Sequence, residues 1–117
     1  MSNNQYPIHK RIFDFVVRVL NLVKALPKTN QNLVLINQIT RSVTSIGAND
    51  QEADGATTKK DFIRCYTIVK KEAKETNYWL QVIAETNEGF KQRMNQLVQE
   101  GREIEAIISS IIQKKKA

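Results

Sequence analysis

Apolar residues recur every three or four positions through four long segments of this chain, which is the spacing of one helix face. The pattern covers about 9–25, 31–54, 58–85 and 88–114, and no alternating strand pattern occurs. Breaks of a few residues separate the segments, and short connections make sequential helices antiparallel neighbours. The 117 residues have room for one domain. The sequence therefore predicts an all-α fold, in which residues 1–117 form a single antiparallel up-down-up-down four-helix bundle.

The breaks carry the residues that end and begin helices. Residues 1–8 are expected to be a loose lead-in, and the first helix should end before Pro27, because a proline biases the preceding residue away from helix. Asn30 is a candidate N-cap of the second helix. Gly55 is the expected stop of that helix, and Thr57 or Thr58 is the candidate N-cap of the third, with Thr58-Lys59-Lys60-Asp61 resembling a capping box.

The first segment is more apolar than one bundle helix requires. From Ile12 to Val23, nine of twelve residues are apolar, and only Asp14, Arg18 and Asn21 interrupt the run. A helix in a four-helix monomer needs a narrower apolar face. Either another subunit covers the excess, which is the simpler explanation and predicts a homo-oligomer, or the helix lies centrally within its own fold.

Small hydroxyl and amide side chains form a stripe beside the apolar seam of the second segment, and two carboxylates lie beside the seam of the third. A buried polar group left unpaired costs about 1–3 kcal/mol, so we expect these groups to be hydrogen-bonded to one another where the two helices meet. The predicted structural network consists of Arg41, Ser45, Asn49, Glu52, Glu72 and Glu75.

At two other places in the chain, the sequence violates a local structural preference. Asp50, Glu52 and Asp54 crowd the end of the second helix, where the helix dipole disfavours negative charge. Such a violation marks either a functional or interface site or a nearby cation, for which Lys59 or Lys60 is the candidate. Gly101 lies on the apolar seam of the fourth segment, where glycine costs about 1 kcal/mol relative to alanine, and it is expected to permit a close helix crossing.

The residues that most enzymes use are scarce. His9 is the only histidine and lies near the expected frayed end, so one chain cannot assemble a histidine triad or metal site. Cys65 is the only cysteine and reads as a buried, inert thiol rather than a nucleophile. The carboxylates of Glu72 and Glu75 lack the Glu-x-x-His motif of bundle di-iron sites, and no phosphate-cradling glycine loop occurs. We expect no catalytic residue, no metal and no cofactor.

The balance of charge points towards anionic partners. The formal net charge is +6 and the pI about 9.6, which favours nucleic acid, although the charge is spread along the chain and a solvated lysine surface is the alternative. A pair such as Lys71 and Glu75 is expected to neutralise part of it. The candidate nucleic-acid-binding residues are Lys59, Lys60, Arg64, Lys71, Lys74, Arg18 and Arg41.

The sequence also predicts where the protein acts. No apolar run approaches the roughly 20 residues that span a bilayer, and the polar start lacks a signal-peptide core. A single cysteine fits a reducing compartment. We therefore expect a cytoplasmic protein with no membrane partner.

One set of residues resembles a known family over about residues 12–112. The matching motif is Arg41-Ser42-x-x-Ser45-Ile46-x-x-Asn49-x-x-Glu52-Ala53, followed by Lys60-Asp61-Phe62 and by Lys71-Glu72-x-x-Glu75-x-x-Tyr78-Trp79-Leu80. It is similar to the bacterial four helix bundle proteins, also called 23S rRNA-intervening-sequence proteins. The chain departs from the family at Gly47, where many members carry proline, and at Asp54-Gly55, where many carry glycine directly after the glutamate.

This resemblance implies a ring-shaped homopentamer and a relation to the accessory variability determinants of diversity-generating retroelements, which bind nucleic acid and a reverse transcriptase. The function expected from it is a non-enzymatic, oligomeric scaffold that binds nucleic acid, with structured RNA favoured over DNA. The alternative is a protein-interaction module, for example an accessory subunit that docks a reverse transcriptase or another partner, whose basic charge is incidental.

Overall fold

The computed structural model describes residues 7–117, and this part of the chain contains four α-helices and no strand. The helices are α1 (Ile8–Ala25), α2 (Asn30–Asp54), α3 (Lys59–Thr86) and α4 (Glu88–Lys116). Their bounds lie within two residues of those expected from the apolar spacing. Residues 1–6 of the expected lead-in lie outside the described residues, and Ile8 is already helical.

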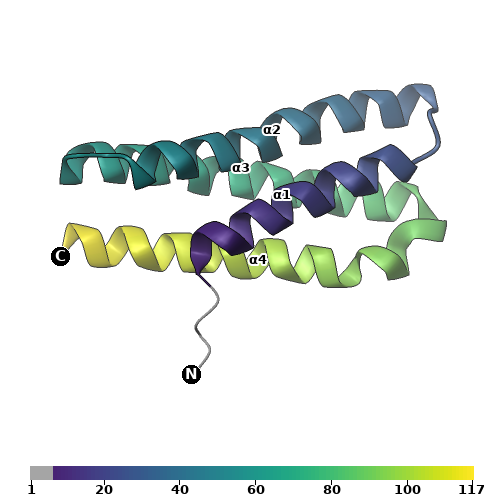
Figure 1. Cartoon of the computed structure of the whole chain (residues 1–117). Coiled ribbons are helices and arrows are strands. Elements are labelled where there is room, and N and C mark those ends of the chain that lie inside the picture. Colours follow the sequence, from purple (N-terminus) through teal and green to yellow (C-terminus); the bar gives the residue numbers. More distant parts are fainter. Residues whose placement is uncertain (1–6) are drawn as a thin grey trace.

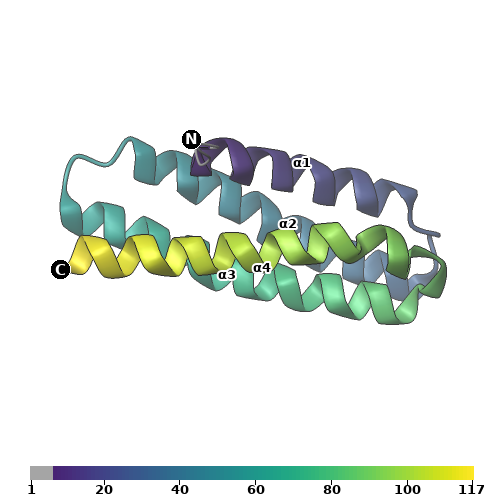
Figure 2. The ribbon, with the colours of Figure 1, turned by 90° about the horizontal axis from the view of Figure 1, so that it is seen from below.

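The helices pack around one long axis, and the described residues measure 45 × 30 × 18 Å. Both α1 and α3 pack against α2 and α4, while the pairs α1/α3 and α2/α4 make no close backbone approach in residues 7–117. The α1–α2 and α3–α4 connections lie at one end of the molecule, and the α2–α3 connection and the C-terminus lie at the other (Figures 1 and 2). This arrangement is a four-helix bundle with α1 and α3 at opposite corners.

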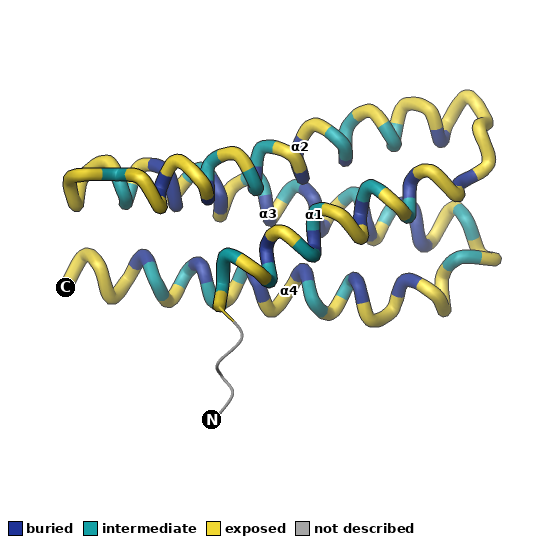
Figure 3. Tube along the Cα trace, in the orientation of Figure 1, coloured by how far each residue is buried: buried dark blue, intermediate teal, exposed yellow. Residues whose placement is uncertain are grey.

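The core follows the seams that the spacing predicts. Figure 3 shows the buried positions recurring along the inner side of each helix. Ile39, Val43 and Ile46 of α2 and Leu80 of α3 are fully buried. Cys65 is also buried. Burial of apolar surface contributes about 25 cal/mol per Å², so these seams are the main source of the fold's stability.

The helix ends are fixed by side chains, in one case not the expected one. Thr29, rather than Asn30, caps α2, because its Oγ1 accepts a hydrogen bond from the backbone N–H of Asn32 at 3.1 Å. Thr58, one of the two predicted candidates, caps α3 because its Oγ1 accepts a hydrogen bond from Asp61 N at 3.0 Å. The side-chain amides of Asn32 and Asn87 bond each other at 2.9 and 3.1 Å. This amide pair joins the two connections at one end of the bundle.

The apolar excess of α1 is not explained by a central position, because α1 lies at a corner. Phe13 is 63% exposed and Val17 is 40% exposed. Its inner side is buried through Ile12, Phe15 and Val19. The outer apolar side chains Phe13 and Val17 are therefore only partly covered within the described chain.

Gly101 lies at the closest crossing in the core. Nδ2 of Asn77 in α3 donates to the Gly101 carbonyl of α4 at 3.0 Å and to Oε1 of Glu105 at 2.9 Å. A Cβ at position 101 would overlap the Asn77 amide and lie 3.1 Å from Cζ of Phe15 in α1. Gly101 therefore permits three helices to meet, which agrees with the close crossing expected at this position.

Candidate nucleic-acid interface

A line of exposed lysines runs along the side of α3 that faces α4. Asn77 marks this side, because its amide bonds α4. Lys70 and Lys59 precede Asn77 by seven and eighteen positions, which is close to two and five turns of helix. Lys74 lies one turn before Asn77, and Gln81 one turn after it. Lys70 was not among the predicted nucleic-acid contacts. Its spacing of eleven residues from Lys59, about three turns of helix, would have placed both on one face.

Lys60 and Lys71 lie eleven positions apart, about three turns of helix, and therefore share a face of α3. This face is adjacent to the lysine line and points more towards solvent. The five lysines of α3 are exposed, and none forms a hydrogen bond or ion pair with another residue between 7 and 117. The expected neutralisation of Lys71 by Glu75 does not occur. Glu75 instead accepts a hydrogen bond from Nε1 of Trp79 at 3.2 Å.

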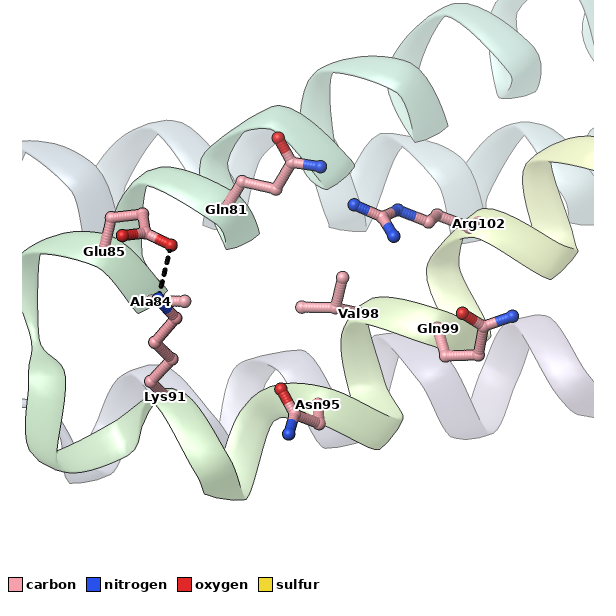
Figure 4. Close-up of a pocket in the computed structure, with 8 residues that line it drawn as sticks. All are labelled: Gln81, Ala84, Glu85, Lys91, Asn95, Val98, Gln99 and Arg102. Carbon is pink, nitrogen blue, oxygen red and sulfur yellow. Dashed lines mark ion pairs between the residues drawn. The ribbon is translucent and has the colours of Figure 1, made fainter.

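A pocket of about 480 Å³ opens between α3 and α4 beyond the end of this lysine line. Its lining residues are Gln81, Ala84, Glu85, Lys91, Asn95, Val98, Gln99 and Arg102 (Figure 4). Ala84 and Val98 are apolar and lie on its inner side, whereas the others are polar. No pattern within a single helix predicts this pocket, because three of its lining residues come from α3 and five from α4.

The charges in the pocket are unevenly compensated. Lys91 Nζ forms an ion pair with Glu85 at 2.9 Å (Figure 4), and this hydrogen bond to Glu85 raises the pKa of Lys91. The guanidinium of Arg102, which also lines the pocket, forms no ion pair with a carboxylate of the described chain. The pocket therefore presents one unpaired cation beside three side-chain amides. We use the name α3/α4 basic face for this pocket together with Lys59, Lys60, Lys70, Lys71 and Lys74.

Of the remaining predicted cations, Arg64 lies on the same stripe of α3 as Lys60 and Lys71, four positions after the first and seven before the second. It is left out of the α3/α4 basic face because it lies 3.8 Å from the carboxylate of Asp61. Arg18 of α1 lines a hollow with Arg93 between α1 and α4. Arg41 is exposed on α2. The structure thus brings the predicted lysines of α3 together and separates Arg18 and Arg41 from them.

The predicted polar network is formed only in part within one chain. Nδ2 of Asn49 donates to the carbonyl and Oγ of Ser45, at 2.9 and 3.2 Å. No hydrogen bond in residues 7–117 joins Arg41, Glu52 or Glu72 to one another or to this pair. A buried polar contact between α2 and α3 is made instead by Ser42 and Thr76, which follow Arg41 and Glu75 in the sequence. Ser42 Oγ and Thr76 Oγ1 lie 2.7 Å apart.

A second polar cluster forms at the acidic end of α2. Asp50 is 1% exposed, and its carboxylate accepts a hydrogen bond from Tyr66 Oη at 2.7 Å. His9 Nδ1 lies 3.0 Å from the same carboxylate, and His9 Nε2 lies 3.3 Å from Asp54. Burial, and then the hydrogen bond to Asp50, raise the pKa of Tyr66 well above its usual range.

His9, not Lys59 or Lys60, is therefore the basic side chain that contacts Asp50 and Asp54. His9 belongs to the first turn of α1 rather than to a frayed end. The acidic residues at the end of α2 indicated that a basic group would lie nearby. The sequence did not show that this group would be His9.

Some kinds of site are absent from the described residues. No group of three or more His, Cys, Asp or Glu side chains between residues 7 and 117 could hold a metal ion. No helix in this part of the chain is long and apolar enough to cross a membrane.

Four long helices around one apolar core, with a basic face along two of them, define a small all-α bundle protein. Residues 4–110 match the family described as 23S rRNA-intervening sequence protein, and the chain belongs to this family. A solved structure from Bacteroides thetaiotaomicron VPI-5482, described as a protein of unknown function from the S23 ribosomal protein family, is 37% identical. The match covers 91% of this chain and 98% of that one, with a TM-score of 0.82. No curated protein matches the chain.

Proposed function

We propose that this protein is a non-enzymatic, oligomeric scaffold that binds structured RNA through the α3/α4 basic face. The observation that supports it is the row of lysines on α3, which are exposed and have no carboxylate partner in the described chain. Lysines in such a row can contact successive phosphates and release counterions, which supplies most of the affinity of sequence-independent binding. The description of the family, which refers to an intervening sequence of 23S rRNA, favours RNA over DNA.

The same proposal includes an antiparallel bundle that assembles as a ring of five copies. The exposed Phe13 and Val17 of α1 support assembly, because a second subunit would remove them from water. The number five comes from the family resemblance. A ring repeats the net charge of +6 in every subunit, so weak contacts at several copies of the basic face add up through avidity.

A second candidate function, protein docking, is favoured by a different surface. An apolar hollow of about 440 Å³ lies at the seam of α2 and α3, where Val34, Leu35 and Val82 meet. Val34 is 60% exposed. Such a surface suits a polypeptide partner, including another copy of this chain or a polymerase, and its affinity would respond little to salt.

Salt dependence separates the two candidates. We expect the affinity for a labelled RNA hairpin to fall steeply as salt is raised, and replacement of Lys59 and Lys74 by glutamine to weaken binding. The slope of log affinity against log salt should decrease by about 1 for each lysine that contacts a phosphate. A matched control changes Lys24 and Lys114, two exposed lysines away from the basic face, to glutamine. Equal effects of the two double variants, or no binding at low salt, would contradict the proposal.

A further inference from the structure

The pocket between α3 and α4 differs in chemistry from the lysine row that leads to it. The row supplies positive charge alone, which suits a phosphate backbone of any sequence. The pocket adds the amides of Gln81, Asn95 and Gln99 around an apolar inner side. Side-chain amides carry both donors and acceptors, which is the chemistry that pairs with the edge of a nucleobase.

Two of these amides are available to a ligand. Gln81 and Asn95 are exposed and make no side-chain hydrogen bond with the rest of the described chain, whereas Gln99 donates to Glu103 at 3.2 Å. The Glu85 carboxylate is compensated by Lys91. An anionic strand approaching the pocket therefore meets the unpaired Arg102 with little opposing charge.

An exposed aromatic ring lies directly beside the pocket. A hollow of about 300 Å³ is lined by Tyr78 and Val82 and shares Gln81 and Glu85 with the pocket. Tyr78 is 58% exposed, and its ring packs edge-on against Trp79 with centroids 4.9 Å apart. This contact holds the ring in place and leaves much of its surface open to water. Aromatic side chains in such positions stack unpaired bases.

Lys74, Tyr78 and Gln81 follow one another along α3 at spacings of four and three residues. A cation, an aromatic ring and an amide thus occupy successive turns of one helix face, opposite Arg102 and Asn95 of α4. A continuous duplex keeps its bases stacked and their pairing edges occupied. An unpaired strand exposes base faces for stacking and base edges for hydrogen bonding, beside the phosphates of its backbone.

We propose that the groove between α3 and α4 binds an unpaired segment of RNA, with one base stacked on Tyr78 and a neighbouring base edge held by Gln81 and Asn95. Arg102 and Lys74 contact the flanking phosphates. This inference rests on the RNA-binding function proposed above and specifies which part of a structured RNA the face selects. The ring of Tyr78 and the two amides supply the preference, while the lysine row supplies general affinity.

The test compares two labelled RNAs of equal length, a hairpin with an unpaired loop and a blunt duplex, by equilibrium titration at one moderate salt concentration. We expect the wild-type protein to prefer the hairpin. Tyr78→Ala should reduce hairpin affinity about tenfold and leave duplex affinity unchanged, whereas Tyr78→Phe, which keeps the ring, should retain the preference. The double variant Gln81→Ala with Asn95→Ala should also lose the preference.

The control double variant, Gln92→Ala with Gln96→Ala, removes two exposed amides of α4 that do not line the pocket and should bind like wild type. Thermal melts of every variant check that the bundle remains folded. Equal affinity for hairpin and duplex, or equal loss in both after Tyr78→Ala, would overturn the inference while leaving RNA binding in place. Absence of binding to both RNAs would overturn the proposed function as well. A DNA hairpin of the same sequence that binds more tightly than the RNA hairpin would overturn the assignment to RNA.

Discussion

Asp50 places a carboxyl group within the core, where side chains from two other helices lie within hydrogen-bond distance of its oxygens. Its carboxylate is almost completely buried and lies within hydrogen-bond distance of both Tyr66 and His9. A buried carboxylate without such donors is costly. These three side chains come from three helices, so the cluster ties α1 and α3 to the end of α2.

Removing one hydroxyl tests this cluster. We expect Tyr66→Phe to lower the free energy of unfolding by about 2 kcal/mol, because a hydrogen bond to a charged group contributes about 1.5–3 kcal/mol. Tyr78→Phe removes the same atom from an exposed ring and should change stability by less than about 0.5 kcal/mol. Urea denaturation measures both. Equal midpoints for the two variants would show that the Tyr66 hydroxyl contributes nothing to the buried carboxylate.

Gly101 makes a second prediction at the residue scale. Gly101→Ala should destabilise the protein by about 1–3 kcal/mol, because the added methyl group displaces the Asn77 amide. This loss exceeds the gain of about 1 kcal/mol in helix propensity. Gly89→Ala is the matched control, since nothing lies within 4 Å of its added Cβ. A Gly101→Ala variant with an unchanged or higher melting temperature would contradict the close crossing.

At the scale of the helix, α1 is held at its sides by polar contacts as well as by its apolar seam. Arg11 donates from Nε and Nη2 to the two oxygens of Glu100 at 3.0 and 2.7 Å, and from Nη2 to Glu103 at 3.0 Å. The hydrogen bond to Glu100 is the largest cause that raises the pKa of Arg11. A bidentate ion pair of this kind is stronger than an ordinary surface ion pair.

We expect Arg11→Met, which keeps an apolar stem, to destabilise the protein by about 1 kcal/mol, because the Arg11 side chain is only 20% exposed. Arg18→Met should have almost no effect, since Arg18 is exposed and makes no ion pair with the described residues. Thermal unfolding of the two variants gives the comparison. It also bears on Arg18 as an RNA contact, because Arg18→Met should bind RNA like wild type if only the α3/α4 basic face is used.

The helices themselves were predictable from sequence, while the contacts between them were less so. Apolar spacing and capping residues such as Thr58 are local, so the four segments and their seams could be read directly. The bonds from His9 to Asp50, from Arg11 to Glu100 and from Asn77 to Glu105 depend on how one helix is shifted along another. Nothing within a single helix specifies that shift. The sequence therefore predicted most of the lysines of α3 as candidate contacts, but not the residues of α4 that line the neighbouring pocket.

For the whole molecule, the distribution of exposed side chains separates two kinds of surface. The α3/α4 basic face is mainly polar, whereas large apolar side chains are exposed on α1 and on α2, including Phe13, Val17, Leu33 and Val34. Scattered exposed apolar residues are normal on a monomer. Phe13 and Val17, however, lie one turn apart on a helix that the sequence already marks as too apolar for a single chain.

If these residues form a contact between copies, a charge placed there should break the assembly without unfolding the subunit. We expect Phe13→Glu to convert the oligomer into smaller species, because association would bury an unpaired carboxylate. The 63% exposure of Phe13 means that the helix content and melting of the isolated subunit should be retained. Gln92→Glu, which changes the charge equally at an exposed position of α4, should leave the oligomer intact. Size-exclusion chromatography with light scattering gives the masses. A wild-type protein that elutes as a monomer would contradict the ring, and a Phe13→Glu variant of unchanged mass would place the contact between copies elsewhere, with the apolar hollow at the α2/α3 seam as the next surface to test.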